Sequence, residues 1–351
     1  MEKKLKTQDF ALSRIAAKTW GPGLARAREV YTKCIRSALA YGASSFHTPT
    51  AEGGSPVGPA KRLAKAQNRS LRTVVGAYKT TPTRCLETEA WVPPLDLYFN
   101  KRLADFENRL QKPALQAGAG PGAPKVTAGQ VVTEACNRLY LRFRKRRKTR
   151  GQRPRAGPQG PTATEQAAAT VGQWADQRWK TGEKKGQKLP TEGVVELAWQ
   201  TRWQQQREGQ PLRRMADEDP STLLFTNKAL KRHEGLTKAQ SSLLTQARTG
   251  DIGLRDYLFK AKVPGLMTPY CTCGEREETV EHLVVWCSDP PKQKTWENNE
   301  IRSHQDLQLV LRGVGARSAR LVRRVLNWLM DSGRLLEYSL ARRLELDTVG
   351  G

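Results

Sequence analysis

The sequence predicts a mainly α-helical protein: two helical domains joined by a basic, flexible linker, the second carrying a small zinc module. Three observations support this fold class. Apolar residues recur at helical spacing in several windows. Gly- and Pro-rich tracts interrupt the helical pattern at 112–125 and 151–163. Three of the six cysteines also lie within seventeen residues, beside a histidine. We expect domains at 1–111 and 221–351, a linker at 112–163 and a Trp-rich helical connector at 164–220.

The first domain is expected to contain three helices. One covers 26–41 and ends at Gly42, one covers 60–75 and ends at Gly76, and one follows Pro93-Pro94 and runs from 95 to 111. The expected inward residues of the first are Val30, Cys34, Ala38 and Tyr41. Those of the second are Leu63, Ala66, Leu71, Val74 and Val75, and those of the third are Leu95, Phe99, Leu103, Phe106 and Leu110.

The linker contains the electrostatic centre of the chain. The 351 residues have a formal net charge of +26, and 113–160 carry 11 Lys/Arg against one acid, Glu134. Such a field attracts phosphate backbones, so nucleic acid is the favoured partner, ahead of a membrane surface. Nine of the fourteen residues from 142 to 155 are basic and form the candidate nucleic-acid-binding set. These are Arg142, Arg144, Lys145, Arg146, Arg147, Lys148, Arg150, Arg153 and Arg155. Phosphate binding or nuclear import is the functional interpretation of this run, and a solvated tail is the alternative.

The second domain is expected to begin with a helix that Thr237 caps and Gly250 ends, followed by a shorter apolar segment at 254–259. A late helix places Val322, Val325, Leu326 and Leu329 inward. In the connector, Trp199 and Trp203 are better interpreted as helix-packing residues than as base-stacking ones. No stretch approaches the length of a transmembrane helix, and the N-terminus has no apolar run typical of a signal peptide.

The strongest chemical signal is the string from Tyr270 to Cys287, which has the spacing C-x-C-x8-H-x4-C. Zinc favours four tetrahedral thiolate or imidazole ligands, and Cys271, Cys273, His282 and Cys287 supply a Cys3His set. A first shell closed by four protein ligands leaves no position for water, so we expect a structural Zn2+ ion. The alternative is two free cysteines, a core cysteine and a surface histidine, because C-x-C is less usual than C-x2-C.

Several separated strings carry a resemblance to a known family. They are Ala16-Ala-Lys-Thr-Trp-Gly-Pro22, Ala27-Arg-Glu-Val-Tyr31, residues 35–43, Glu89-Ala-Trp-Val-Pro-Pro-Leu95, and residues 241–254 followed by the cysteine string. With these strings the chain resembles the C-terminal portion of a non-LTR retrotransposon reverse transcriptase, especially the Tad-like polyproteins of fungi. The resemblance implies a thumb-like and connection-like fold for 1–111 and a terminal Cys/His module at 271–287. It does not extend to residues 113–215.

The family's polymerase chemistry needs paired palm aspartates that hold two Mg2+ ions. No Asp-Asp pair occurs in this sequence, so we expect no enzyme activity on this chain although the parent family is an RNA-directed DNA polymerase. The expected function is binding of RNA or DNA, in an intracellular and nuclear location without a membrane. An intact retrotransposon polymerase is the second expected partner. The alternative is a domesticated zinc-binding module that recognises another protein.

Overall fold

The computed structural model describes residues 2–43, 47, 58–102, 105, 195, 198–200, 202–203, 227–297, 300–313 and 315–349. Across these ranges the regular structure is helical, and the only pairing of extended backbone is an isolated antiparallel bridge between Tyr270 and Glu277. The prediction of a mainly α protein is confirmed. The expected linker and basic run 142–155 lie outside the described residues. No helix of the described part is long and apolar enough to cross a bilayer.

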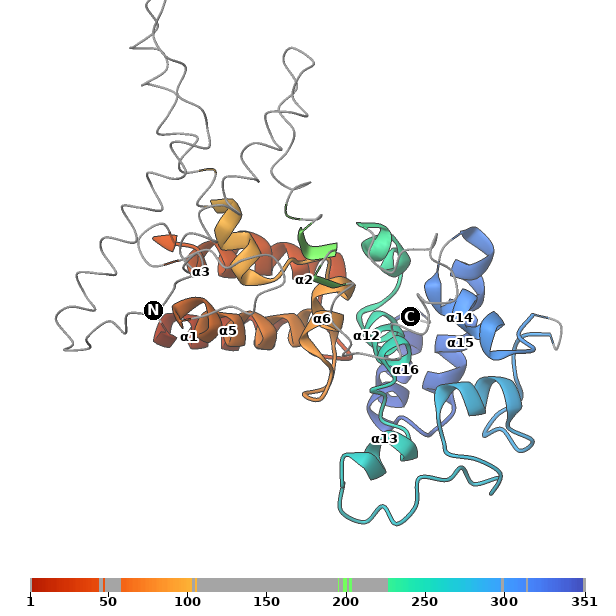
Figure 1. The fold of residues 1–351 in the computed structure, drawn as a ribbon. Coiled ribbons are helices and arrows are strands. Elements are labelled where there is room, and N and C mark those ends of the chain that lie inside the picture. The colour runs from red at the N-terminus through yellow and green to blue at the C-terminus, as the bar shows by residue number, and fades with distance from the viewer. Residues whose placement is uncertain are drawn as a thin grey trace, which may run out of the picture.

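The N-terminal helices pack around one hydrophobic core (Figure 1). Their bounds are α1 Glu2–Ile15, α2 Leu24–Val30, η1 Tyr31–Ile35, α3 Arg36–Leu39, α5 Gly58–Val75 and α6 Thr83–Glu89. Residues 95–102 are also helical. The helix α5 buries Leu63, Ala66, Leu71, Val74 and Val75, as predicted from their spacing. It ends at Gly76, whose φ of 71° lies in the left-handed region that favours glycine. The helices α1 and α6 were not predicted.

The inward face predicted for 26–41 is wrong. Within this run the buried side chains are Ala27, Tyr31, Ile35, Leu39 and Ala40. Of the four predicted residues, Cys34 and Tyr41 are exposed, Ala38 is half-buried, and Val30 is half-buried against the core. The helical run contains the π turn η1, which keeps positions four residues apart on one side through the segment. The larger apolar side chains on that side occupy the core, because they remove more apolar surface from water than Cys34 and Ala38 would.

The C-terminal helices surround a second core (Figure 1). Their bounds are η2 Asn227–His233, α12 Lys238–Thr249, α13 Arg255–Lys260, η3 His282–Trp286, α14 His304–Arg312, α15 Ala316–Asp331 and α16 Leu336–Val349. The predicted cap of α12 is confirmed, since Thr237 and Gln240 form a reciprocal capping box and Gly250 ends the helix in the left-handed conformation. The inward residues predicted for 322–329 are all buried in α15. The helices α14 and α16 were not predicted.

The two groups of helices meet where α5 approaches α12 and where α2 and α6 approach η2 (Figure 1). The Lys238 ammonium donates to the carbonyls of Thr73 and Val74 at the end of α5, at 3.1 and 2.6 Å. This is the favourable position for a cation, because the last carbonyls of a helix carry partial negative charge. Trp199 and Trp203 are buried in the C-terminal core, which agrees with a packing role.

A buried charge cluster lies at the same junction. The Glu89 carboxylate, at the end of α6, pairs with Arg248 Nε at 2.9 Å and with Arg232 Nη1 at 3.3 Å. The two guanidiniums also donate to the carbonyls of Leu311 and Arg312 in α14. Each buried charge therefore has an opposite charge and hydrogen-bond partners, as burial requires. This cluster ties α6, η2, α12 and α14 together.

Candidate metal centre

Cys271 and Cys273 lie on a tight turn that backbone hydrogen bonds hold closed. The Cys271 amide donates to the Arg276 carbonyl at 2.8 Å, and the Gly274 amide donates to the Cys271 carbonyl at 3.0 Å. Gly274 has a φ of 80°, a conformation that other residues rarely adopt. The Tyr270–Glu277 bridge closes the base of this turn. The short spacing between the two cysteines therefore fits a turn that directs both thiols to one side.

His282 and Cys287 occupy the two ends of a single π turn. Thr279 Oγ1 accepts from the His282 amide at 3.1 Å, which caps the start of this helical segment. The Cys287 amide then donates to the His282 carbonyl at 2.8 Å, a bond that spans five residues. Val280, Leu283 and Val284 of this segment are buried in the C-terminal core. The π turn thus presents both side chains to the cysteine turn while its apolar side anchors the segment.

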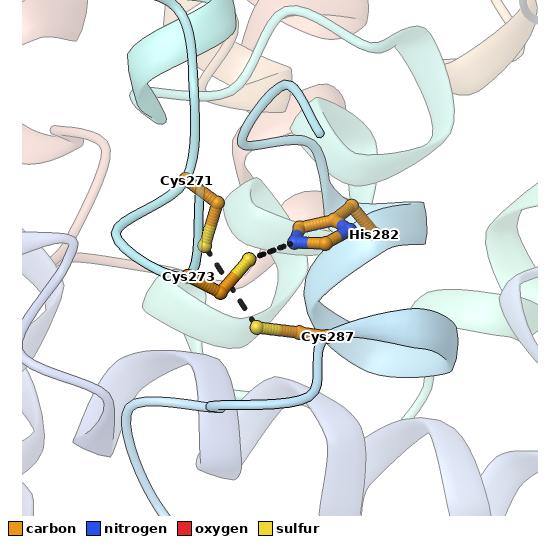
Figure 2. Close-up of side chains that lie close together, drawn as sticks. All are labelled: Cys271, Cys273, His282 and Cys287. Atoms are coloured by element: carbon orange, nitrogen blue, oxygen red, sulfur yellow. Dashed lines mark hydrogen bonds between the residues drawn. The ribbon is translucent and has the colours of Figure 1, made fainter. Parts of the chain in front are cut away.

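The four side chains converge on one point (Figure 2). Their Sγ and ring-nitrogen ligand atoms all lie within 4.8 Å of one another. Cys271 Sγ is 3.8 Å from Cys287 Sγ, and Cys273 Sγ is 3.2 Å from His282 Nε2. Tetrahedral ligands on bonds of about 2.3 Å would place two sulfurs roughly 3.8 Å apart. This cluster could hold a metal ion, and its donor set and spacing are compatible with zinc.

Burial shapes the electrostatics of the cluster. Cys271, His282 and Cys287 are buried, and Cys273 is half-buried. Burial raises the pKa of the Cys287 thiol to about 12, whereas the backbone amide of Glu275 lowers the pKa of the Cys273 thiol. Burial also lowers the pKa of His282, which favours the neutral imidazole that a metal requires. A bound cation would stabilise the thiolate of Cys287 directly.

Two residues outside the ligand set, Arg334 and Glu278, brace the module. Arg334, in the turn after α15, donates to Thr272 Oγ1 at 2.6 Å and lies 3.4 Å from the buried Glu278 carboxylate. Glu278 also accepts from the Arg255 amide at the start of α13, at 3.0 Å. Arg334 is 62 residues from Thr272, a separation that no local pattern could connect.

Three other polar side chains that could contact a ligand, Gln246, Arg248 and His233, are not part of the metal cluster. The candidate nucleic-acid-binding set at 142–155 lies outside the described residues and remains a prediction. Arg248 and Gln246 are buried and bonded within the protein, where Gln246 Nε2 donates to the Gly76 carbonyl at 2.8 Å. His233 lies in the Glu89 cluster, 3.5 Å from the carboxylate. These three side chains are structural in this conformation.

The four side chains could bind one metal ion without a ligand from outside the protein. Such an ion would hold the cysteine turn against η3. Comparison with protein-family models, with curated proteins and with solved structures found no match for this chain.

Proposed function

We propose that this protein binds RNA or DNA without catalysing a reaction on it, and that a structural Zn2+ ion stabilises its C-terminal domain. The zinc part rests on the convergence of Cys271, Cys273, His282 and Cys287, because zinc is the metal that most commonly takes such thiolate-rich tetrahedral sets. Four protein ligands complete the first shell, so the ion would supply folding energy and no water-activating site.

The observation that carries nucleic-acid binding is the net charge of +26. Part of this charge lies on the described helices. The sequence of α5 contains five basic residues and no acid, and Lys61, Arg62, Lys65 and Arg69 are exposed on it. An uncompensated field of this size favours a polyanion partner, since phosphates neutralise it and release their own counterions.

The resemblance to reverse-transcriptase tails supports the same proposal and gives it a context. Under it, residues 1–111 correspond to a thumb-like and connection-like region, and the zinc module to the family's terminal Cys/His module. An intact retrotransposon polymerase and a nuclear location are the corresponding partner and site of action. Because the sequence contains no Asp-Asp pair, incubation with primer, template, nucleotides and Mg2+ should give no extension.

The experiment is a salt titration of RNA affinity. Binding should weaken steeply between about 50 and 200 mM salt, as counterion release requires. Replacing Arg144, Arg146 and Arg147 by glutamine should weaken binding and reduce the slope of log affinity against log salt by about 0.7 for each lost phosphate contact. A control with the same charge change replaces Lys180, Lys184 and Lys185, in the charge-balanced segment 161–220, and should alter the slope less. Absent or salt-independent binding would contradict the proposal.

A second candidate, recognition of another protein, is favoured by the surface of α16. Leu336, Leu340 and Leu344 recur every four residues along it and are 76, 60 and 67% exposed. Apolar side chains at this spacing are typical of a helix face that packs against a partner. A pull-down whose partner survives nuclease treatment, and is lost when Leu340 is replaced by Glu, would favour this function over nucleic-acid binding.

A further inference from the structure

A cavity of about 540 Å³ lies between the end of α12, α13, the start of the zinc-module helix and α14. None of the four candidate zinc ligands lines it, so it is a separate feature of the domain. Its volume falls within the range of pockets that bind small molecules or single side chains of a partner, about 300–1,000 Å³.

The lining combines an apolar wall with carboxylates. The apolar part includes Ile252, Leu254, Val280, Leu307 and Leu311. The acidic part comprises Asp251, Asp256, Glu278 and Glu281. The lining also contains two cations, Arg248 and Lys260, which pair with Glu89 and Asp256.

Three of these carboxylates have partners. Asp256 pairs with Lys260 at 2.8 Å, Glu281 with His304 Nδ1 at 2.5 Å, and Glu278 with the Arg255 amide and Arg334.

Asp251 differs from the other three. Its Oδ2 atom is buried without a hydrogen-bond partner, and within the described residues its carboxylate has no ion pair. It also follows directly after Gly250, the C-cap of α12, where the helix dipole places partial negative charge. A cation at this point would neutralise the carboxylate and the helix end together.

A second buried acceptor lines the same cavity. Gln308 is 4% exposed; its Nε2 atom contacts His304 Nε2, whereas its Oε1 atom has no hydrogen-bond partner. A buried acceptor without a donor costs free energy, which a ligand N–H would recover. Tyr257 lines the cavity too and offers an aromatic ring, a favourable surface for a guanidinium or ammonium group. The cavity therefore offers a carboxylate, an amide acceptor, an aromatic ring and an apolar wall.

We propose that this cavity binds a cationic amine or guanidinium group carried on a short apolar stem. Asp251 is the counter-ion, Gln308 accepts an N–H, and the stem lies against Val280 and Leu307. A lysine or arginine side chain of a polypeptide and a free polyamine share this chemistry. The inference goes beyond nucleic-acid binding, because this site selects a cation.

Calorimetric titration of the zinc-loaded full chain with N-acetyl-arginine amide and with spermidine tests the proposal. At least one should bind saturably, and the tighter of the two identifies the source as a side chain or a free amine. The citrulline analogue of the arginine probe, which is nearly isosteric and uncharged, should bind at least roughly tenfold more weakly.

Two variants localise the binding. Asp251→Asn should weaken it by roughly tenfold or more, whereas Glu234→Gln, which removes an exposed carboxylate outside the cavity, should leave it unchanged. Ala261→Trp should block it independently, because Ala261 lines the cavity and is exposed at the end of α13.

Equal affinity for the citrulline analogue would overturn the proposal, as would wild-type affinity in both pocket variants or no binding up to about 10 mM. RNA affinity measured on the same variants reports separately on the proposed function, since the cavity is not part of the basic segment.

Discussion

Replacing Glu89 by glutamine is expected to be among the most destabilising single changes in this protein. The substitution keeps the shape of the side chain but removes the charge that Arg248 and Arg232 face. Arg248 is 1% exposed and Arg232 6% exposed, so both guanidiniums would remain buried without a carboxylate. Removing one partner of a buried ion pair costs about 3–5 kcal/mol, against a total stability of about 5–15 kcal/mol for a typical domain.

The destabilisation caused by Glu89→Gln should also depend on pH in a defined direction. Burial alone would raise the pKa of Glu89, but Arg248 and Arg232 outweigh burial and hold its pKa well below the ordinary value. A carboxyl with a lowered folded-state pKa contributes stability that is present above its unfolded pKa, about 4.3, and is lost as the pH falls toward the folded value. The difference in unfolding free energy between wild type and Glu89→Gln should therefore be greatest near pH 7 and narrow below about pH 4.

Glu87, on the same helix, provides a matched control. Burial raises the pKa of its carboxyl to about 8, so at pH 7 the folded state mostly holds it protonated. Because the folded pKa is raised, its contribution to stability is present below the unfolded pKa and is lost as the pH rises toward 8. Glu87→Gln should then be neutral or stabilising at pH 7. Urea unfolding of both variants measures their free energies of unfolding. Equal losses of unfolding free energy in Glu89→Gln and Glu87→Gln would refute this account of the cluster.

Three further changes test the fold and its junction. Thr237→Ala removes the capping box of α12 and should lower the free energy of unfolding by about 1 kcal/mol. Thr237→Ser keeps a hydroxyl and should retain most of that stability. An unchanged free energy of unfolding in the alanine variant would exclude a stabilising cap. Gly76→Ala adds a Cβ that overlaps the Ser242 side chain at a φ of 71° and should cost about 2–4 kcal/mol. Gly265→Ala, at a φ of 84° with open space around it, should cost only the backbone part, about 1–2 kcal/mol. Arg334→Met removes the brace on the zinc module and should speed release of zinc to a chelator, and an unchanged release rate would show that the brace is dispensable.

Sequence patterns predicted the parts of this fold that depend on local information. In α5 and α15 the apolar spacing assigned the correct inward residues, because each helix has one apolar side and one charged side. The cap at Thr237 followed from the same kind of local chemistry. For 26–41 the pattern failed, because two sets of side chains recur every four residues in this run, and the set with the larger apolar side chains, Tyr31, Ile35 and Leu39, occupies the core.

The candidate zinc ligands were predictable because they lie within one short stretch, where spacing alone limits the geometry. The junction between the two groups of helices could not be predicted in this way. Glu89 meets Arg232 and Arg248 from 143 and 159 residues away, and nothing beside any of the three marks it as buried. The cavity around Asp251 could not be predicted from the sequence either, because four separate segments must fold before its carboxylates surround one space.

The most direct test of the central claim is the metal content of the purified full chain. We predict about one equivalent of zinc per folded chain, lost on Cys271→Ser together with thermal stability. The prediction also requires that Cys34→Ser, which changes an exposed cysteine outside the cluster, retain its zinc. Zinc below about half an equivalent in fully folded protein, or full stability after chelation, would contradict a structural zinc site.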